Sequence, residues 1–414
     1  MIELRNYQHE IAKRAAECLD EHGCCYLSME CRTGKTLTAL YAASLFNAMS
    51  VLFVTKIKAI PSVKHDYSLL DAHFSLQVVN YESLHKVSGE FDLVICDEAH
   101  TLGAYPKPSK KTSALKAMAE GLPVLYLSGT PSPESYSQLY HQFWVCSFSP
   151  FKQYANFYKW ANVYVDKRQK KVNGYLITDY SKAKKRLIDN VTRDLFISYS
   201  QDEAGFTSNV VERSLSVKMD DGTAQVFKAL RRDRVVNVGG HNIVGDTPAK
   251  LLNKLHQLSG GTVIAEDGAH LILDRSKAKF VKERFAGKKI AIFFCYQSEL
   301  DLLTDEFPEW TDSPEEFQQS KDKVFISQVR RAREGVRLDS ADALVFFNLE
   351  YSYLSYEQGK NRLVSKERTE PANIYFLCSD FGIESEILNA VHDKKDFTLS
   401  YYRGKCARQL TIYD

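Results

Sequence analysis

Short, unbroken apolar runs recur along this chain and constrain its fold more than any other feature. In the first half they occupy residues 25–28, 51–55, 76–79, 91–96 and 124–128, and in the second half residues 290–295, 324–327, 343–348 and 374–378. Few of them alternate apolar with polar residues, so we expect strands that are buried on both faces. Helical patterns, such as that of residues 36–48, separate the runs. The sequence therefore predicts an α/β fold with mostly parallel sheets flanked by helices.

The two series of runs predict two α/β domains, at residues 1–148 and 210–414. The stretch between them, residues 149–209, is expected to form a helical insertion or linker. Within it, residues 152–193 contain eleven Lys and Arg but only three Asp, a local charge of +8, and aromatic residues are interleaved. Such a mixture suits nucleic acid, because cations meet phosphates and rings stack on bases. The alternative is a solvated insertion whose aromatic residues pack on the first domain.

Composition narrows the class of protein. The net charge of +2 over 414 residues excludes a generally basic nucleic-acid binder, so any basic surface must be local. No apolar stretch approaches the roughly 20 residues of a membrane span, and the first residues lack the apolar segment of a signal peptide. The nine cysteines are odd in number and several lie in apolar runs, so we expect small core residues in a reducing compartment. They include no C-x-x-C pair, so no zinc site is expected. We expect a cytoplasmic protein that does not bind membranes.

Two motifs carry the chemistry of nucleoside triphosphate hydrolysis. Gly34, Lys35 and Thr36 form the core of a phosphate-binding loop, and Asp97 and Glu98 follow the apolar run 91–96. Lysine and backbone N–H groups hold phosphates, and a hydroxyl and an aspartate hold Mg²⁺. A second carboxylate orients the attacking water. The combination predicts that Lys35 binds the β- and γ-phosphates, that Thr36 and Asp97 hold Mg²⁺, and that Glu98 is the base.

The phosphate loop departs from the usual pattern at two positions. Met29 stands where G-x-x-x-x-G-K-T has its first glycine, and Arg32 stands where the variant G-x-G-K-T has one. Glycine normally lets the backbone turn and approach phosphate closely. Arg32 can still leave its backbone N–H pointing inward. Because the core of Gly34, Lys35 and Thr36 is intact, we interpret the loop as a tolerated variant in which Arg32 and Thr33 also bind nucleotide.

Together these motifs resemble those of superfamily-two helicases of the DEAD/DEAH type. The similarity is greatest to the Swi/Snf-type branch, in a compact form that resembles phage-encoded helicases. The further segments that carry the resemblance lie, in chain order, at residues 4–8, 54–56, 80–84, 97–100, 128–131, 293–296, 327–328, 334–338 and 356–362. The resemblance covers nearly the whole chain and implies two tandem RecA-like domains.

The resemblance also implies roles for single residues. It implies that Arg5, Gln8 and Gly335 bind the nucleotide and that Gln8 recognises adenine. For coupling of the nucleotide to the nucleic acid it implies His100, Ser128, Thr130 and Gln358. As nucleic-acid contacts it implies Thr55, Lys56, Tyr81, Tyr296, Gln328 and Arg330.

The sixth motif of the family, usually Q-x-x-G-R-x-x-R, is incomplete in this chain. Gln358 and Arg362 match it, but Asn361 replaces the glycine and Ser365 replaces the final arginine. Arg368, three residues later, is a candidate replacement. The arginine finger, a catalytic residue, is therefore expected to be Arg362, Arg368 or both.

The resemblance implies an ATP-dependent helicase or translocase that uses ATP and Mg²⁺ between its two domains. DNA is favoured over RNA as its partner, and the protein is expected to act as a monomer or with a replication or recombination protein, in a bacterial host cell if phage-encoded. Two alternatives stay open. One is a nucleic-acid-binding module with weak or lost ATPase activity, and the other is the motor subunit of a larger restriction or defence complex.

Overall fold

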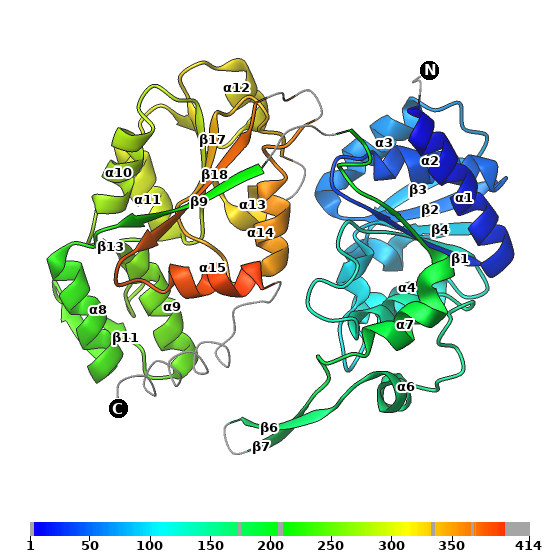
Figure 1. The fold of residues 1–414 in the computed structure, drawn as a ribbon, viewed down its shortest axis with the longest axis horizontal. Coiled ribbons are helices and arrows are strands. Elements are labelled where there is room, and N and C mark those ends of the chain that lie inside the picture. The colour runs from blue at the N-terminus through cyan, green and yellow to red at the C-terminus, as the bar shows by residue number, and fades with distance from the viewer. Residues whose placement is uncertain are drawn as a thin grey trace. The chain divides into compact units, whose positions relative to one another are not determined.

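The chain folds into two compact units, Met1–Phe206 and Thr207–Asp414 (Figure 1). The computed structural model describes residues 4–172, 175–205, 210–332, 336–365, 368 and 370–393. Each unit is built on a six-stranded sheet in which all paired strands run parallel. This confirms the predicted fold of two tandem parallel-sheet α/β cores.

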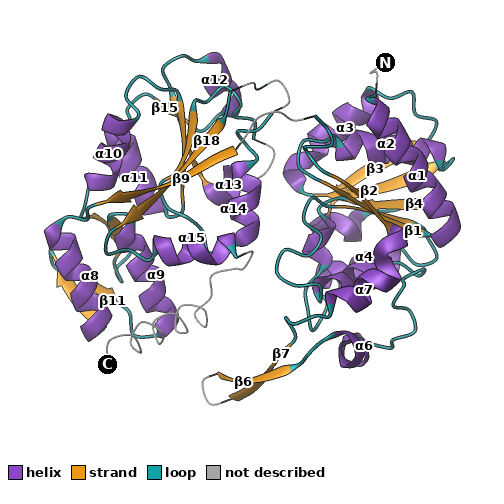
Figure 2. Ribbon diagram, in the orientation of Figure 1, coloured by secondary structure: helices purple, strands orange, loops and turns teal. Residues whose placement is uncertain are grey.

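The sheet of the first unit has the strand order β3-β2-β4-β5-β1-β8. Its strands are β1 (Cys24–Met29), β2 (Ser50–Thr55), β3 (Ser75–Asn80), β4 (Leu93–Cys96), β5 (Val124–Leu127) and β8 (Phe196–Tyr199). The central strands β4 and β5 are buried at every residue. Their unbroken apolar character thus follows from helices on both faces of the sheet, as Figure 2 shows.

Seven α-helices accompany this sheet in the described part of the first unit. They are α1 (Asn6–His22), α2 (Lys35–Leu45), α3 (Ile60–Ser68), α4 (Lys110–Met118), α5 (Gln138–Trp144), α6 (Phe157–Tyr164) and α7 (Lys185–Thr192). Short 3₁₀ helices occupy Ile57–Ala59, Tyr81–Lys86, Ala99–Leu102 and Arg193–Leu195. Figure 2 places α1, α2 and α3 on one face of the sheet and α4 and α7 on the other.

Helix α2 ends earlier than the sequence pattern predicts. The apolar pattern continues to residue 48, but the helix ends at Leu45. Asn47 has a φ of 57°, in the left-handed region that asparagine tolerates better than most residues. This residue reverses the chain, and Ala48 is buried as part of the turn that leads into β2.

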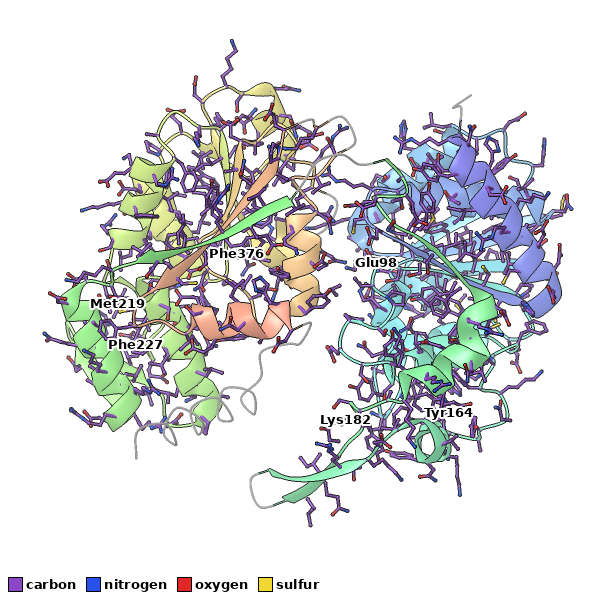
Figure 3. The ribbon with its side chains drawn as sticks, in the orientation of Figure 1. Glu98, Tyr164, Lys182, Met219, Phe227 and Phe376 are labelled. Atoms are coloured by element: carbon purple, nitrogen blue, oxygen red, sulfur yellow. The ribbon has the colours of Figure 1, made fainter. Side chains whose placement is uncertain are left out.

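The sheet of the second unit has the order β15-β16-β14-β17-β18-β9. Its strands are β9 (Val210–Val217), β14 (Ile290–Phe294), β15 (Trp310–Thr311), β16 (Val324–Gln328), β17 (Ala343–Phe346) and β18 (Ala372–Ser379). The unit also contains two small antiparallel hairpins that are separate from this sheet. They are β10–β11 (Val235–Val238 and His241–Val244) and β12–β13 (Thr262–Ile264 and His270–Ile272). Phe346 of β17 and Phe376 of β18 stack across these neighbouring strands with ring centroids 4.9 Å apart, and Phe376 is labelled in Figure 3.

The helices of the second unit alternate with its strands. They are α8 (Asp221–Asp233), α9 (Pro248–Ser259), α10 (Ser276–Arg284), α11 (Gln297–Glu306), α12 (Pro314–Gln319), α13 (Val329–Ala332), α14 (Tyr353–Lys360) and α15 (Glu384–His392). In the described part of the chain, none of the helices has both the length and the apolar character that spanning a bilayer requires.

The stretch between the predicted domains is part of the first unit, which corrects the expected boundary at residue 148. Strand β8 pairs in parallel with β1, and the rings of Phe157, Trp160 and Tyr164 are buried in the first core. The stretch is also less helical than predicted, because β6 (Arg168–Val172) and β7 (Tyr175–Asp179) form an antiparallel hairpin between α6 and α7.

Candidate active site

The phosphate loop joins the end of β1 to the start of α2. Gly34 caps this helix with a φ of 82°, and Arg32, two residues earlier, has a φ of 64°. Left-handed residues in such a loop turn successive backbone N–H groups toward one side and create an anion-binding concavity. The N-terminus of the eleven-residue helix α2 adds its free N–H groups and dipole. The loop therefore has the geometry of a phosphate site, although one of its two left-handed positions is an arginine.

Arg32 is strained where a glycine would be relaxed. We expect Arg32→Gly to raise the free energy of unfolding by up to about 1 kcal/mol, as left-handed strain of about 1–2 kcal/mol outweighs a glycine entropy cost of about 0.5–1 kcal/mol. Gly34→Ala is the matched control and should destabilise, because the new Cβ would lie 2.3 Å from Gln8 Nε2. Urea denaturation of both variants tests this, and a destabilised Arg32→Gly protein would contradict it.

The start of α1 lies directly on the phosphate loop. The Tyr7 hydroxyl donates to Thr33 O at 3.0 Å, and Gln8 Nε2 donates to Gly34 O at 3.3 Å. Gln8 Oε1 accepts the backbone N–H of Arg5 at 3.0 Å, and the Gln8 side chain is buried. Arg5 and Gln8, which the sequence predicts to bind nucleotide, are thus brought beside the loop, and adenine recognition by Gln8 stays a prediction.

The end of β8 also lies against the phosphate loop, a position that the sequence pattern does not predict. Tyr199 stacks on Tyr7 with ring centroids 4.6 Å apart, and its carbonyl accepts the N–H of Glu30 at 2.9 Å. Gln201 Nε2 donates to Cys31 O at 2.9 Å. The only signal in the sequence is the short run Phe196–Tyr199, which Ser198 interrupts, so pairing of β8 with β1 could be recognised only in the tertiary structure.

Asp97 lies at the end of β4, next to the phosphate loop on the same edge of the sheet. Its Oδ2 accepts the Thr55 hydroxyl at 2.7 Å, and its Oδ1 accepts the N–H of Glu98 at 2.9 Å. Burial and the Glu98 charge raise the pKa of Asp97 to about 6, against the opposing effects of Thr55 and of the Lys35 ammonium. Lys35 Nζ donates to Glu30 O at 3.0 Å. Lysine, carboxylate and loop thus converge on one site.

Glu98 connects this site to the end of β5. It has a φ of 50°, and its Oε2 lies 3.2 Å from His100 Nδ1. The same nitrogen lies 2.9 Å from Ser128 Oγ, which also accepts the N–H of Thr130 at 3.1 Å. The three residues of the first unit that are predicted to couple nucleotide to nucleic acid, His100, Ser128 and Thr130, therefore lie in contact with one another beside the predicted base.

The second unit places three predicted nucleic-acid residues at the carboxyl ends of neighbouring strands. Gln328, the last residue of β16, donates to Cys295 O at 2.7 Å beyond β14. The Tyr296 hydroxyl lies 2.8 Å from His256 Nδ1, and Arg330 is exposed and pairs with Glu350 Oε1 at 2.6 Å. Their contact with nucleic acid stays a prediction. Gly335 lies outside the described residues.

The comparison with known families assigns a segment that runs from the end of β2 in the first unit to the end of α9 in the second. Residues 55–260 match the family model of the SNF2-related domain. This part of the chain is an SNF2-related domain. Its match includes Asp97, Glu98, His100 and Ser128 but begins after the phosphate loop, which is assigned by its own geometry. The predicted membership of superfamily two, in its Swi/Snf-type branch, is thereby confirmed, and members of this family are ATPases.

A solved structure similar to this chain is the SWI2/SNF2 ATPase core domain of Sulfolobus solfataricus. The two share 14% identity with a TM-score of 0.42, over 95% of this chain and 89% of that chain. No curated protein matches the sequence.

Two residues of the SNF2-related domain do not have the predicted surface role. Thr55 has no exposed area and donates to Asp97, and Tyr81 is 3% exposed and donates to Asp97 O at 2.5 Å. Burial raises the pKa of Tyr81 well above its usual range. The prediction that both contact nucleic acid is wrong for this conformation, because their side chains position the carboxylate from inside the core. Lys56, the next residue after Thr55, is half-buried.

The two candidate arginine fingers have different surroundings. Arg368 donates to four backbone carbonyls, those of Asp339, Ala341, Glu370 and Pro371, at 2.9–3.3 Å. Because these bonds hold the guanidinium in place, they favour a structural role for Arg368, and its predicted catalytic role stays a prediction. Arg362 follows α14, and its Nε donates to Gln358 O at 2.9 Å.

Gln358 lies on the buried side of α14. It is 5% exposed, and its Oε1 has no hydrogen-bond partner among the described residues. A buried acceptor of this kind costs about 1–3 kcal/mol unless a partner reaches it. Its predicted coupling role is compatible with this position and stays a prediction.

The oxygen donors near the loop suit Mg²⁺. Mg²⁺ is typically held by one or two carboxylates together with substrate phosphates and water. Thr36 and Asp97 supply a hydroxyl and a carboxylate beside the phosphate loop, so the predicted pair fits this ion. Among the described residues, no group of three or more His, Cys, Asp or Glu side chains is arranged to hold a metal ion.

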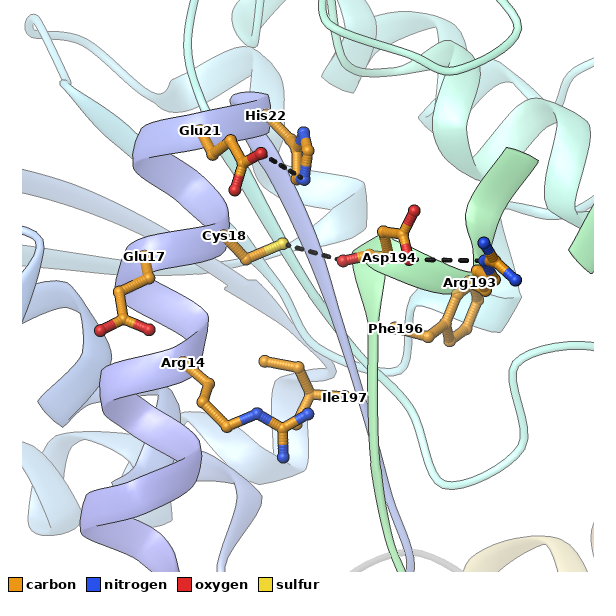
Figure 4. Close-up of a pocket in the computed structure, with 9 residues that line it drawn as sticks. All are labelled: Arg14, Glu17, Cys18, Glu21, His22, Arg193, Asp194, Phe196 and Ile197. Carbon is orange, nitrogen blue, oxygen red and sulfur yellow. Dashed lines mark hydrogen bonds and ion pairs between the residues drawn. The ribbon is translucent and has the colours of Figure 1, made fainter. Parts of the chain in front are cut away.

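A separate pocket of about 480 Å³ lies near the C-terminal half of α1 (Figure 4). Cys18, on its wall, donates to Cys24 O at the first residue of β1, so the pocket is at the opposite edge of the sheet from the phosphate loop. Arg14, Glu17 and Asp194 give it mixed charge. Because it lies away from Lys35 and Asp97, the pocket is not the nucleotide site.

Proposed function

We propose that this chain is an ATP-dependent motor that moves along or unwinds nucleic acid, with DNA favoured over RNA. One observation carries the proposal. The phosphate loop with Lys35, the Asp97–Glu98 pair and the His100–Ser128 contact lie together at the carboxyl edge of one parallel sheet, the edge at which open α/β sheets bind ligands. The match to the SNF2-related domain supports the more general part of this proposal, that the chain belongs with ATPases that act on nucleic acid.

The residues of the site have separable roles in this proposal. Lys35 and the N–H groups of the loop bind the phosphates, and Thr36 and Asp97 hold Mg²⁺. The ion, when bound, neutralises charge on the phosphate oxygens. Glu98 orients and deprotonates the attacking water. His100, which lies against both Glu98 and Ser128, transmits a movement of the Glu98 side chain to the end of β5. Arg362, in the second unit, is proposed to stabilise charge on the γ-phosphate.

Measurement of ATP hydrolysis by the purified chain, with and without DNA, tests the proposal. We expect turnover that depends on Mg²⁺ and rises when single- or double-stranded DNA is added. A parallel assay with RNA decides the preferred nucleic acid. Turnover that neither nucleic acid changes would contradict the proposal.

A nucleic-acid-binding module with lost turnover is the second candidate. Ser365 replaces the second arginine of the sixth motif, and Arg368, the candidate replacement, is held by backbone carbonyls. This candidate predicts binding of nucleic acid without hydrolysis. If the chain is instead the motor subunit of a restriction or defence complex, hydrolysis by the isolated chain should be weak and should rise with a partner protein.

Cations near α7 are proposed to bind the nucleic-acid backbone. Lys182, Lys185 and Arg186 are exposed, whereas Lys184 pairs with Asp166 at 3.3 Å. Figure 3 shows Lys182 at the base of the β6–β7 hairpin.

Removing these three charges together should weaken binding and flatten its salt dependence. Each lost phosphate contact lowers the log–log slope by about 0.7–0.9, so the Lys182→Ala, Lys185→Ala, Arg186→Ala protein should lose about 2–3. Fluorescence anisotropy over a range of salt concentrations measures this slope.

A charge-matched control keeps the net charge equal. Lys279, Arg284 and Lys288 are exposed on or just after α10, before β14 begins, and their replacement by alanine should leave the slope unchanged. Equal slopes in the two triple variants would show that the cations near α7 form a solvated face.

A further inference from the structure

The β6–β7 hairpin projects from the first unit (Figure 1). Its five residue pairs, from Arg168 opposite Asp179 to Val172 opposite Tyr175, form a two-stranded sheet, to which no further strand is added in the described part of the chain. A lone two-stranded hairpin is marginally stable in water, so its retention outside the core requires anchoring at its base.

Two large aliphatic side chains are exposed on this hairpin. Leu176 is 70% exposed and Ile177 is 51% exposed. Because successive residues of a strand point to opposite faces, both faces of the hairpin present an apolar side chain to solvent. The core of the first unit covers neither face, so the hairpin is suited to insert between two surfaces.

The first strand of the hairpin and its approach are basic. Residues 167–171 read Lys-Arg-Gln-Lys-Lys, and Lys167 and Arg168 are exposed. With Asp166 and Asp179, residues 166–179 carry four cations and two anions, a net charge of +2. Cations beside apolar side chains match nucleic acid, in which charged phosphates flank apolar base faces. Charge complementarity thus favours a nucleic acid as the occupant.

The base of the hairpin is held rigidly by the first unit. The hydroxyls of Ser135 and Ser137 donate to Ser181 O at 2.7 Å and to Tyr180 O at 2.6 Å, just beyond β7. Asp166 N donates to Lys182 O at 2.9 Å, and the Tyr180 ring packs against Phe157 at 5.3 Å. The hairpin is therefore anchored to the core at its base.

The anchoring serines continue the segment that follows the coupling residues. Ser128 and Thr130 lie at its start, and Gln142 of α5 donates to Pro131 O at 2.8 Å. Gln138 Oε1 accepts the N–H groups of Glu134 and Ser135 at 3.1 and 3.4 Å. A short, hydrogen-bonded segment thus connects the contact of His100 with Ser128 to the base of the hairpin.

We propose that the β6–β7 hairpin is a strand-separating wedge at the junction of double- and single-stranded nucleic acid. The proposal rests on the proposed motor function and assigns it unwinding. Leu176 and Ile177 insert between bases at the junction, as apolar side chains of other nucleic-acid-binding proteins do, and Lys167 and Arg168 bind the flanking phosphates. Movement of the segment after Ser128 advances the wedge.

A double substitution at the exposed apolar positions tests the wedge. In the Leu176→Ser, Ile177→Ser protein, we expect displacement of a labelled strand from a forked DNA duplex to fall about 10-fold or more. Hydrolysis of ATP stimulated by single-stranded DNA should stay within about 2-fold of the unsubstituted protein. The matched control is Leu187→Ser, Val191→Ser on α7, where both side chains are 41% exposed. It should retain both activities.

The outcomes separate this proposal from the motor function. Absence of DNA-stimulated hydrolysis in the unsubstituted protein overturns both. Hydrolysis without strand displacement in that protein overturns the wedge alone, as does equal displacement by the hairpin variant. Loss of hydrolysis together with displacement in the hairpin variant also overturns it, because the hairpin would then serve general binding. Only selective loss of displacement supports it.

Discussion

Replacing Lys35 with alanine is expected to abolish nucleic-acid-stimulated ATP hydrolysis. Lys35 begins α2 at the phosphate loop, and its ammonium acts on Asp97 across the site. Loss of a preorganised charge that stabilises the transition state costs on the order of 10²–10³ in rate. Steady-state ATPase measurements at saturating DNA give this ratio, and unchanged turnover in the folded variant would contradict the assignment of the site.

Glu98→Gln provides the complementary variant. The amide keeps the shape of the side chain but cannot accept the proton of the attacking water, so hydrolysis should be lost while ATP still binds. Binding of a fluorescent ATP analogue distinguishes this variant from Lys35→Ala, in which phosphate binding is itself weakened. A Glu98→Gln protein that fails to bind nucleotide would show that Glu98 has a structural role, for example through His100 Nδ1 at 3.2 Å.

The second large effect is expected at Arg362. If Arg362 is the principal arginine finger, Arg362→Ala should lower kcat on the order of 10³-fold, because charge on the transferred phosphoryl group grows in the transition state. ATP binding should be largely spared, since the finger acts on the transition state. Equilibrium binding and steady-state turnover, measured on the same preparation, separate these two quantities.

Arg368→Ala is the control within the same segment. Its guanidinium donates to four backbone carbonyls, so its loss should lower the melting temperature while kcat stays near that of the unsubstituted protein. The opposite pattern, in which Arg368→Ala loses turnover without loss of stability, would support Arg368 as a finger. Normal turnover in both variants would favour a finger supplied by another residue or by a partner.

The hairpin bears on whether the proposed motor separates the strands of a duplex. SNF2-related proteins are ATPases, and the family match by itself leaves open whether strands are separated. The exposed Leu176 and Ile177 provide a feature that translocation along an intact duplex does not require. A measurement of strand displacement is therefore more informative for this chain than a further measurement of hydrolysis.

Local sequence determined nine of the twelve strands in the two six-stranded sheets, together with the chemistry at their ends. Buried parallel strands need unbroken apolar residues, so the runs that became β2, β4 and β14 could be recognised without a structure. The phosphate loop and Asp97–Glu98 were recognisable because phosphate and Mg²⁺ chemistry requires particular residues at short spacing.

Only the tertiary structure decided the roles that depend on partners distant in sequence. Strand β8 is short and polar at Ser198, and it exists because β1 offers an edge to pair with. Thr55 and Tyr81 became internal supports of Asp97, because neighbouring strands bring them together across the sheet. The surroundings of Arg368 favour a structural role because four carbonyls from two segments converge on it. Residue type sets what a side chain can bind, whereas packing sets whether it faces a ligand or the core.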